Sequence, residues 1–141
     1  MLIEAKVRVK RNIDGKPRKR TETYIMEKDF FTQAEYAVSA LLSNDAEEFE
    51  IQSLKLSPIK EITEQQTGEH TFIATLRDIF HDDEGNEKFL RYKVLLWADN
   101  LTQANQRAQD LSHQGYDMLI EGIKQVDYEY LTEEDNEQAD E

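Results

Sequence analysis

Residues of the types that catalyse reactions or bind metals are few in this chain and unfavourably spaced. There is no cysteine, which excludes disulfides, thiolate zinc sites and a cysteine nucleophile. His70, His81 and His113 are too far apart in sequence to share a metal on one element. The acidic residues after His81 fall in a predicted turn and lack the spacing of a calcium loop. We therefore predict no metal site, no cofactor and no enzymatic activity.

Cationic and aromatic side chains instead alternate along two predicted hairpins, a pattern that favours binding of single-stranded nucleic acid. In such surfaces cations neutralise phosphates, and flat rings stack on bases of any identity. Residues 1–30 hold nine Lys and Arg against five Asp and Glu, although the net charge of the whole chain is −13. The predicted phosphate contacts are Lys6, Arg8, Lys10, Arg18, Lys19, Arg91 and Lys93, with Phe89 and Trp97 as stacking platforms.

Other interpretations of the same residues stay open. Antiparallel sheets often have a solvated polar face, where lysines discourage pairing between sheet edges. A protein-interaction module that modulates a host factor, or a part of a homo-oligomeric assembly, would instead use the acidic surface. A nucleotide-binding sponge would hold its ligand between repeated halves or between subunits. Our leading prediction is a non-catalytic accessory protein that binds single-stranded nucleic acid.

An internal repeat indicates how the chain positions these residues. The segment Phe31–Ala34 recurs as Leu101–Ala104, and the same shift of 70 residues relates Asp29 to Asp99 and Gly15 to Gly85. Beyond the helices the shift becomes 69 residues, because Ile51 and Leu54 match Ile120 and Ile123. We therefore predict a single domain over residues 1–131, built of repeats at about 2–60 and 71–131.

The first repeat has the pattern of two strands, a helix and a third strand. Apolar residues alternate with polar ones from Ile3 to Val9, which indicates a half-buried strand, and Asp14-Gly15 is a hairpin signal. A second strand is predicted at residues 21–26, and a third at residues 49–56. Between them, Thr32 and Glu35 have the spacing of a capping box at a helix start. The helix residues expected to be buried are Ala34, Ala37, Val38, Leu41 and Leu42.

The second repeat follows the same order. Its hairpin turn is predicted at Glu84-Gly85, and its helix is predicted to start at Thr102 and to stop near Gly115. Its third strand is predicted at residues 116–130, with a break at Gly122. The residues of its hairpin expected to be buried are Leu90, Tyr92, Val94, Leu96 and Ala98.

These elements predict an α+β fold of two pseudo-repeated β-β-α-β units. Each helix has one apolar stripe, which has to be buried against a sheet. We therefore expect antiparallel strands with both helices on one face. Whether the strands form one sheet of six or two smaller sheets stays open.

The last ten residues differ in composition from the rest of the chain. Thr132–Glu141 contains six acidic residues and no basic or large apolar one, which predicts a disordered tail. Such a tail would compete with nucleic acid for the basic surface, recruit a host or replication protein, or only improve solubility. The N-terminus lacks a signal-peptide pattern, and no apolar run reaches the ~20 residues that cross a bilayer. We therefore predict a cytoplasmic protein without a membrane partner.

The order of these motifs resembles that of a known family. The motifs are Glu4-Ala5-Lys6-Val7, Asp14-Gly15-Lys16, Thr21–Met26, Phe31–Glu35 and Glu48–Lys55. Together they are similar to small uncharacterised proteins from gut-dwelling anaerobes and their phages, catalogued as a domain of unknown function. The resemblance covers nearly all of the chain except the tail, and it carries no catalytic residues. It implies a phage or mobile-element origin, and with it an accessory role in replication or recombination.

Overall fold

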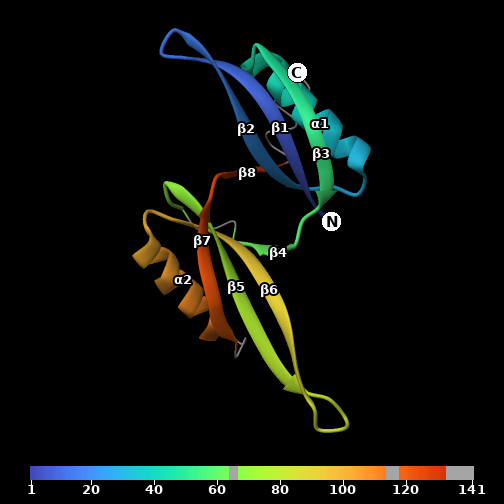
Figure 1. Cartoon of the computed structure of the whole chain (residues 1–141), viewed down its shortest axis with the longest axis vertical. Coiled ribbons are helices and arrows are strands. Elements are labelled where there is room, and N and C mark those ends of the chain that lie inside the picture. The colour runs from blue at the N-terminus through green and yellow to red at the C-terminus, as the bar shows by residue number, and fades with distance from the viewer. Residues whose placement is uncertain (64–66, 114–117, 133–141) are drawn as a thin grey trace. The chain divides into compact units, whose positions relative to one another are not determined.

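The order of elements repeats along the chain, as the sequence predicts. A computed structural model describes residues 1–63, 67–113 and 118–132 (Figure 1). The elements of the first repeat are β1 (Leu2–Ile13), β2 (Lys16–Glu27), α1 (Phe31–Asp45), β3 (Glu48–Leu56) and β4 (Ile59–Ile62). Those of the second are β5 (His70–His81), β6 (Glu87–Ala98), α2 (Leu101–His113), β7 (Leu119–Val126) and β8 (Tyr128–Leu131). The α+β class and the β-β-α-β repeat are thus confirmed.

Eight of the ten elements in the described part of the chain are strands, and they form two four-stranded sheets. The strand orders are β3-β1-β2-β8 and β4-β6-β5-β7. The short strands β4 and β8 pair in parallel with β6 and β2, so both sheets are mixed rather than purely antiparallel. The sequence did not predict β4, and it predicted the residues of β8 as the end of a longer strand. Each repeat thus gives its last strand to the sheet of the other repeat.

By their contacts the residues group into two compact units. The first unit is Met1–Ser57 with the chain from Tyr128 onward, and the second is Pro58–Asp127. In each unit one helix packs on one face of the sheet, which we call the helix face; the opposite face is the outer face (Figure 1). That the two units behave as one domain stays a prediction.

The two hairpins differ in how they turn. Ile13 pairs with Lys16, and the two residues between them have positive φ values, 53° for Asp14 and 80° for Gly15. Such a turn matches the right-handed twist of its strands and favours Asp-Gly. The second hairpin has a longer loop between His81 and Glu87, with Gly85 at a φ of 83°.

The helix starts correct the predicted capping box of Thr32 and Glu35. The cap position of α1 is Phe30, so Thr32 lies inside the first turn. The side chain of Gln33 satisfies the free backbone groups, because its Oε1 accepts from the N–H of Asp29 and of Phe30. In α2, Gln103 accepts in the same way from the Asp99 N–H, and its own N–H donates to Asn100 Oδ1. Asparagine and glutamine at this spacing form a capping box.

The predicted break at Gly122 is a β-bulge, and the strand continues through it. Thr75 pairs with Gly122 and Leu76 with Ile120, so Glu121 is an extra residue on β7. The first repeat has a bulge at the matching place, since Lys6 pairs with Ser53 and Val7 with Ile51. The predicted strand at residues 116–130 is instead divided at Asp127 into β7 and β8. Gly115, the predicted helix stop, lies outside the described residues.

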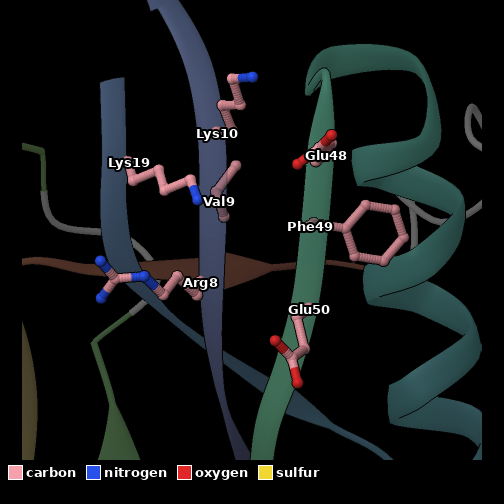
Figure 2. A pocket seen from close by; sticks show the side chains of 7 residues that line it. All are labelled: Arg8, Val9, Lys10, Lys19, Glu48, Phe49 and Glu50. Carbon is pink, nitrogen blue, oxygen red and sulfur yellow. The ribbon is translucent and has the colours of Figure 1, made fainter. Parts of the chain in front are cut away.

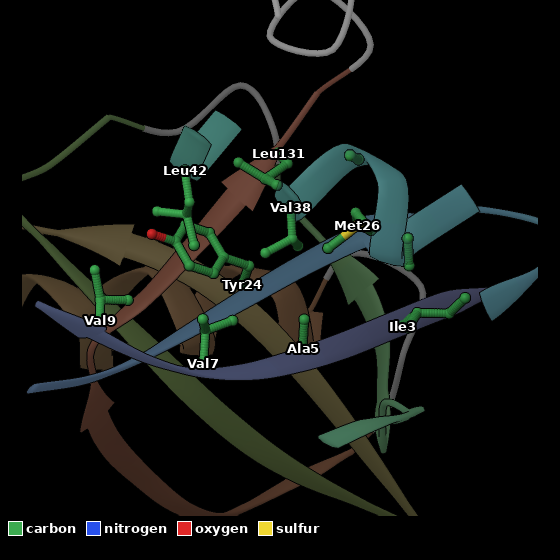
Figure 3. Close-up of a cluster of buried hydrophobic side chains, with 11 residues drawn as sticks. Ile3, Ala5, Val7, Val9, Tyr24, Met26, Val38, Leu42 and Leu131 are labelled. Atoms are coloured by element: carbon green, nitrogen blue, oxygen red, sulfur yellow. The ribbon is translucent and has the colours of Figure 1, made fainter. Parts of the chain in front are cut away.

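Each unit has its own apolar core between the helix and the sheet. In the first, the alternating residues of β1 meet Val38 and Leu42 of α1, with Tyr24, Met26 and Leu131 beside them (Figure 3). In the second, Phe72, Ala74, Leu96 and Ala98 of the sheet meet Ala104 and Ala108 of α2, and the partly buried Leu111 packs beside them. Small helix residues allow a close approach, and the second core has fewer large side chains.

Candidate nucleic-acid interface

Strand pairing places four of the predicted phosphate contacts on one surface. Residues that alternate along a strand share a face, and so do residues directly opposite each other on neighbouring strands. Lys6, Arg8 and Lys10 alternate with the buried residues of β1, and Lys10 lies opposite Lys19 of β2. The four cations therefore lie together on the outer face of the first sheet.

Acidic residues of β3 border this basic surface on one side. Arg8 lies opposite Glu50, and Lys10 lies opposite Glu48. These residues line a shallow hollow of about 430 Å³, in which the side chains of Arg8 and Lys19 extend over β1 and β2 (Figure 2). Phe49 points instead toward α1, on the helix face (Figure 2).

Most of the cations on this surface have no acidic partner. Lys10 forms an ion pair with Glu47 at 3.8 Å between Nζ and Oε2. Lys6, Arg8 and Lys19 make no ion pair among the residues that the structure describes. In a chain of net charge −13, cations left without partners are available to an external anion.

Arg18 is separated from the other predicted contacts of the first unit. It lies opposite Arg11, and Arg11 shares its face with Val7 and Val9, which are core residues. Arg18 therefore belongs to the helix face of the hairpin, beyond the end of the core. The prediction grouped it with Lys19 because a sequence run of cations does not state which face each one occupies.

A hydrogen-bonded network occupies the helix face beside Arg18. Arg11 donates to both oxygens of Glu22 at 2.8 and 2.9 Å, and Arg20 Nε and Tyr24 Oη donate to the same carboxylate. Burial alone would raise the pKa of Glu22, but these donors outweigh it and lower the pKa to about 2. Burial and the adjacent carboxylate raise the pKa of the Tyr24 hydroxyl. Arg11 and Arg20 are thus held by the partly buried carboxylate of Glu22 and are not free for phosphate.

The remaining predicted contacts share the outer face of the second sheet. Phe89, Arg91, Lys93 and Trp97 alternate along β6, away from Val94 and Leu96. The Phe89 ring is half exposed, whereas Lys93 and Trp97 are partly buried. Arg91 pairs with Glu121 of β7 at 3.1 Å, between Nε and the carboxylate oxygens.

Arg77 completes this second surface and was missing from the predicted set. Its guanidinium carbon lies 5.6 Å from the centre of the Phe89 ring, and that of Arg91 lies 5.2 Å from it. Both distances fit cation–π contacts, which orient the ring and the cations together. The signal was available in the sequence, because Phe72, Ala74 and Leu76 alternate as apolar residues and Arg77 follows them at an outward position.

Leu90 corrects the predicted buried set of this hairpin. It is 63% exposed, because it lies on the helix face beyond the part that α2 covers. Phe80, Phe89 and Ile79 are exposed nearby at 41%, 49% and 38%. The burial of Val94, Leu96 and Ala98 is confirmed, and Tyr92 is partly buried.

All predicted residues except Arg18 therefore fall into two groups, one in each unit, and Arg77 joins the second group. The first is Lys6, Arg8, Lys10 and Lys19, and the second is Arg77, Phe89, Arg91, Lys93 and Trp97. Among the described residues, no three of His, Asp or Glu are arranged to hold a metal ion. Asp82, in the acidic turn after His81, accepts hydrogen bonds from the N–H groups of Glu84 and Asn86 and so organises the loop.

Comparisons with known proteins describe the chain as a whole. A family model with the description "Domain of unknown function (DUF4494)" matches residues 1–138. No curated protein and no solved structure matches the chain. Neither helix of the described part is long and apolar enough to cross a membrane.

Proposed function

The chain belongs to the DUF4494 family of domains of unknown function, and we propose that it is a non-catalytic protein that binds single-stranded nucleic acid. The observation that carries the proposal is the basic surface of the first unit. Its four cations share the outer face of a hairpin, and Lys6, Arg8 and Lys19 lack acidic partners among the described residues.

The spacing of the cations suits a flexible phosphate backbone. Alternate residues of one strand lie roughly 6.6–7 Å apart, which is close to the distance between successive phosphates of an extended single strand. Lys6, Arg8 and Lys10 form such a row along β1, and Lys19 widens it at one end. Contacts of this kind supply affinity without sequence preference.

The second unit supports a single-stranded rather than a duplex ligand. Phe89 offers a half-exposed ring near two guanidinium groups, and a ring can stack only on a base that is not enclosed in a duplex. Arg77 and Arg91 would contact the phosphates that flank such a base. We propose the two surfaces as separate subsites, each tested by its own substitutions.

The proposal includes a biological setting and partners. An accessory role in replication or recombination of a phage or mobile element fits a small non-catalytic protein that binds single strands. The acidic tail, which apart from Thr132 lies outside the described residues, would compete with nucleic acid or recruit a replication protein of the host.

A binding titration with matched variants tests the function. Fluorescence anisotropy of a labelled single-stranded oligonucleotide is measured at low salt for the wild type, R8E/K19E and K28E/K60E. Both double variants change the net charge equally, but Lys28 and Lys60 lie outside the basic surface. We expect R8E/K19E to bind about 30-fold more weakly and K28E/K60E to stay within about threefold of the wild type.

Two results would contradict the proposal. One is the absence of any binding of the oligonucleotide by the wild type at low salt, also after removal of the tail. The other is an equal loss of affinity in both variants, which would mean that only the total charge matters. Quenching of Trp97 in the same titration reports whether the second unit takes part.

A further inference from the structure

The two hairpins extend beyond the strands that flank them, and these extensions have complementary chemistry. We call residues 11–22 the first arm, because β3 pairs with β1 only as far as Lys10 and β8 pairs with β2 only from Thr23. Residues 78–92 form the second arm, since β7 pairs with β5 only as far as Arg77 and β4 pairs with β6 only from Lys93. We propose that the helix face of the second arm docks onto the helix face of the first arm of a second copy of this chain.

Exposed apolar side chains make the second arm a docking surface. On its helix face Phe80 is 41% exposed and Leu90 is 63% exposed. On its outer face Ile79 and Phe89 lie opposite each other and are also exposed. A two-stranded hairpin is only marginally stable alone in water, and apolar residues on both of its faces are best stabilised by a partner.

The charges of the two arms indicate that the second arm binds the first arm of another copy. The first arm contains five Lys and Arg against two Asp and Glu, and the second contains two against five. Their net charges are therefore +3 and −3. Two second arms would repel each other, whereas a first arm and a second arm attract, which makes the contact head to tail.

Individual residues on the helix faces fit this pairing. Lys16 and Arg18 make no ion pair among the described residues, and Ile13, opposite Lys16, is partly exposed. On the second arm, Asp83 and Glu84 of the loop are exposed, and the Phe80 ring offers a face to a guanidinium. The Phe89 ring already receives two guanidinium groups within its own unit, so the same chemistry is present on this arm.

The proposed contact does not use the basic surface of the outer face. Arg18 and Lys16 lie on the opposite face of the hairpin from Lys6, Arg8 and Lys19. Self-association and nucleic-acid binding are therefore separable by substitution. The inference goes beyond the proposed function and does not rest on it.

Charge-swapped variants test the contact in the full chain. In D83K/E84K the second arm becomes basic, and in K16E/R18E the first arm becomes acidic. Both pairs are exposed, and Asp82 is left intact because it organises the loop. E35K/D45K and K28E/K60E are controls with the same changes in net charge at sites outside the arms.

The association of nuclease-treated protein is measured by light scattering after gel filtration at low salt. We expect the wild type and both controls to self-associate, and salt to weaken this association. Each swapped variant alone should associate at least about tenfold more weakly, and an equimolar mixture of the two should restore association, since opposite arms again meet. A monomeric wild type at high concentration overturns the proposal.

Two further outcomes are decisive. If the swapped variants associate as strongly as the wild type, the arms do not form the contact. If both are monomeric and their mixture stays monomeric, the arms do not meet head to tail. If R8E/K19E loses oligonucleotide binding but still self-associates, this inference stands. If self-association is absent while oligonucleotide binding is intact, the proposed function stands and this inference fails.

Discussion

The two hairpin arms of this chain have the same backbone plan and opposite surfaces. At positions related by the repeat, Arg11 corresponds to Phe80, and Glu22 to Tyr92. The first arm holds a partly buried carboxylate among arginines, whereas the second exposes apolar side chains and acids. The difference begins where the helix stops covering the sheet. Packing against the helix constrains the residues beneath it, and residues beyond it are free to diverge in function.

The apolar cores of the two units also differ, in the size of the side chains under each helix. Val38 and Leu42 of α1 correspond to Ala108 and Ser112 of α2, so the first unit fills the space under its helix with larger side chains. The first unit thus combines a larger core with a polar arm. The second combines a smaller core with an apolar arm, which agrees with a second unit that gains stability from a partner.

The largest expected effect concerns these cores. Leu42 is fully buried, and L42A leaves a cavity in the first unit, so we expect it to lose about 3 kcal/mol of unfolding free energy. Urea denaturation measures the loss. L101A, at an exposed leucine of α2, should change stability by less than about 0.5 kcal/mol. Equal losses in the two variants would contradict the account of the cores.

The network on the first arm gives a pH-dependent effect. The fold lowers the pKa of Glu22 from 4.5 to about 2, so the stability it contributes is present above pH 4.5 and is lost as the pH falls toward 2. We expect E22Q to lose about 2 kcal/mol at pH 7 and much less at pH 3, because protonation has already weakened the wild type.

The matching change in the second repeat is Y92F, which removes one hydrogen bond at 3.0 Å from Tyr92 Oη to Glu61. It should cost about 1 kcal/mol at pH 7. Thermal unfolding at pH 7 and pH 3 measures the loss in E22Q, and Y92F at pH 7 gives the cost of a single hydrogen bond for comparison. A loss in E22Q that is the same at both pH values would exclude a charged role for Glu22.

A substitution on the second arm distinguishes its two faces. Phe89 lies on the outer face beside Arg77 and Arg91, and Phe80 lies on the helix face. F89A should weaken oligonucleotide binding about tenfold through the loss of a stacked base, while F80A should leave it unchanged. Anisotropy titration measures both. If F80A weakens binding as much as F89A does, the arm contributes only a general apolar surface.

The smallest expected effect compares the turns. Gly15 and Gly85 have φ values of 80° and 83°, and a Cβ at either position would meet no atom within 4 Å. The cost of alanine is therefore conformational, about 1 kcal/mol for G15A in the tight two-residue turn. Gly85 lies in a longer loop whose backbone adjusts more easily, so the melting temperature should fall less in G85A than in G15A. A larger fall in melting temperature for G85A than for G15A would contradict this expectation about the two turns.

The sequence predicted most of the fold because its signals are local. Alternation in β1, the Asp14-Gly15 turn and the apolar stripe of α1 each reflect neighbouring residues, and they are confirmed except that Leu41 is only partly buried. The strand β4 was missed, and β8 was not separated from β7, because each is only four residues long and pairs with a strand of the other repeat. The helix caps were misplaced because Gln33 acts through its side chain, where Thr32 had the commoner signature.

The candidate site was predictable in part for a related reason. Alternation placed Lys6, Arg8 and Phe89 on the outer faces correctly. Arg18 was added from the run of cations around the turn, which does not tell their faces, and its pairing with Arg11 places it on the helix face. Leu90 was expected inside because alternation alone does not tell how far a helix covers its hairpin.

The central claim, that the outer face of the first hairpin binds phosphates, is tested most directly by the salt dependence of oligonucleotide binding. The four cations of this face contribute about −3 to the slope of log Kobs against log salt concentration, since each contact to a single strand contributes about −0.7. R8E/K19E should make the slope shallower by about 1.4, and K28E/K60E should leave it unchanged. A wild-type slope near zero, or an R8E/K19E slope equal to that of the wild type, would contradict the claim.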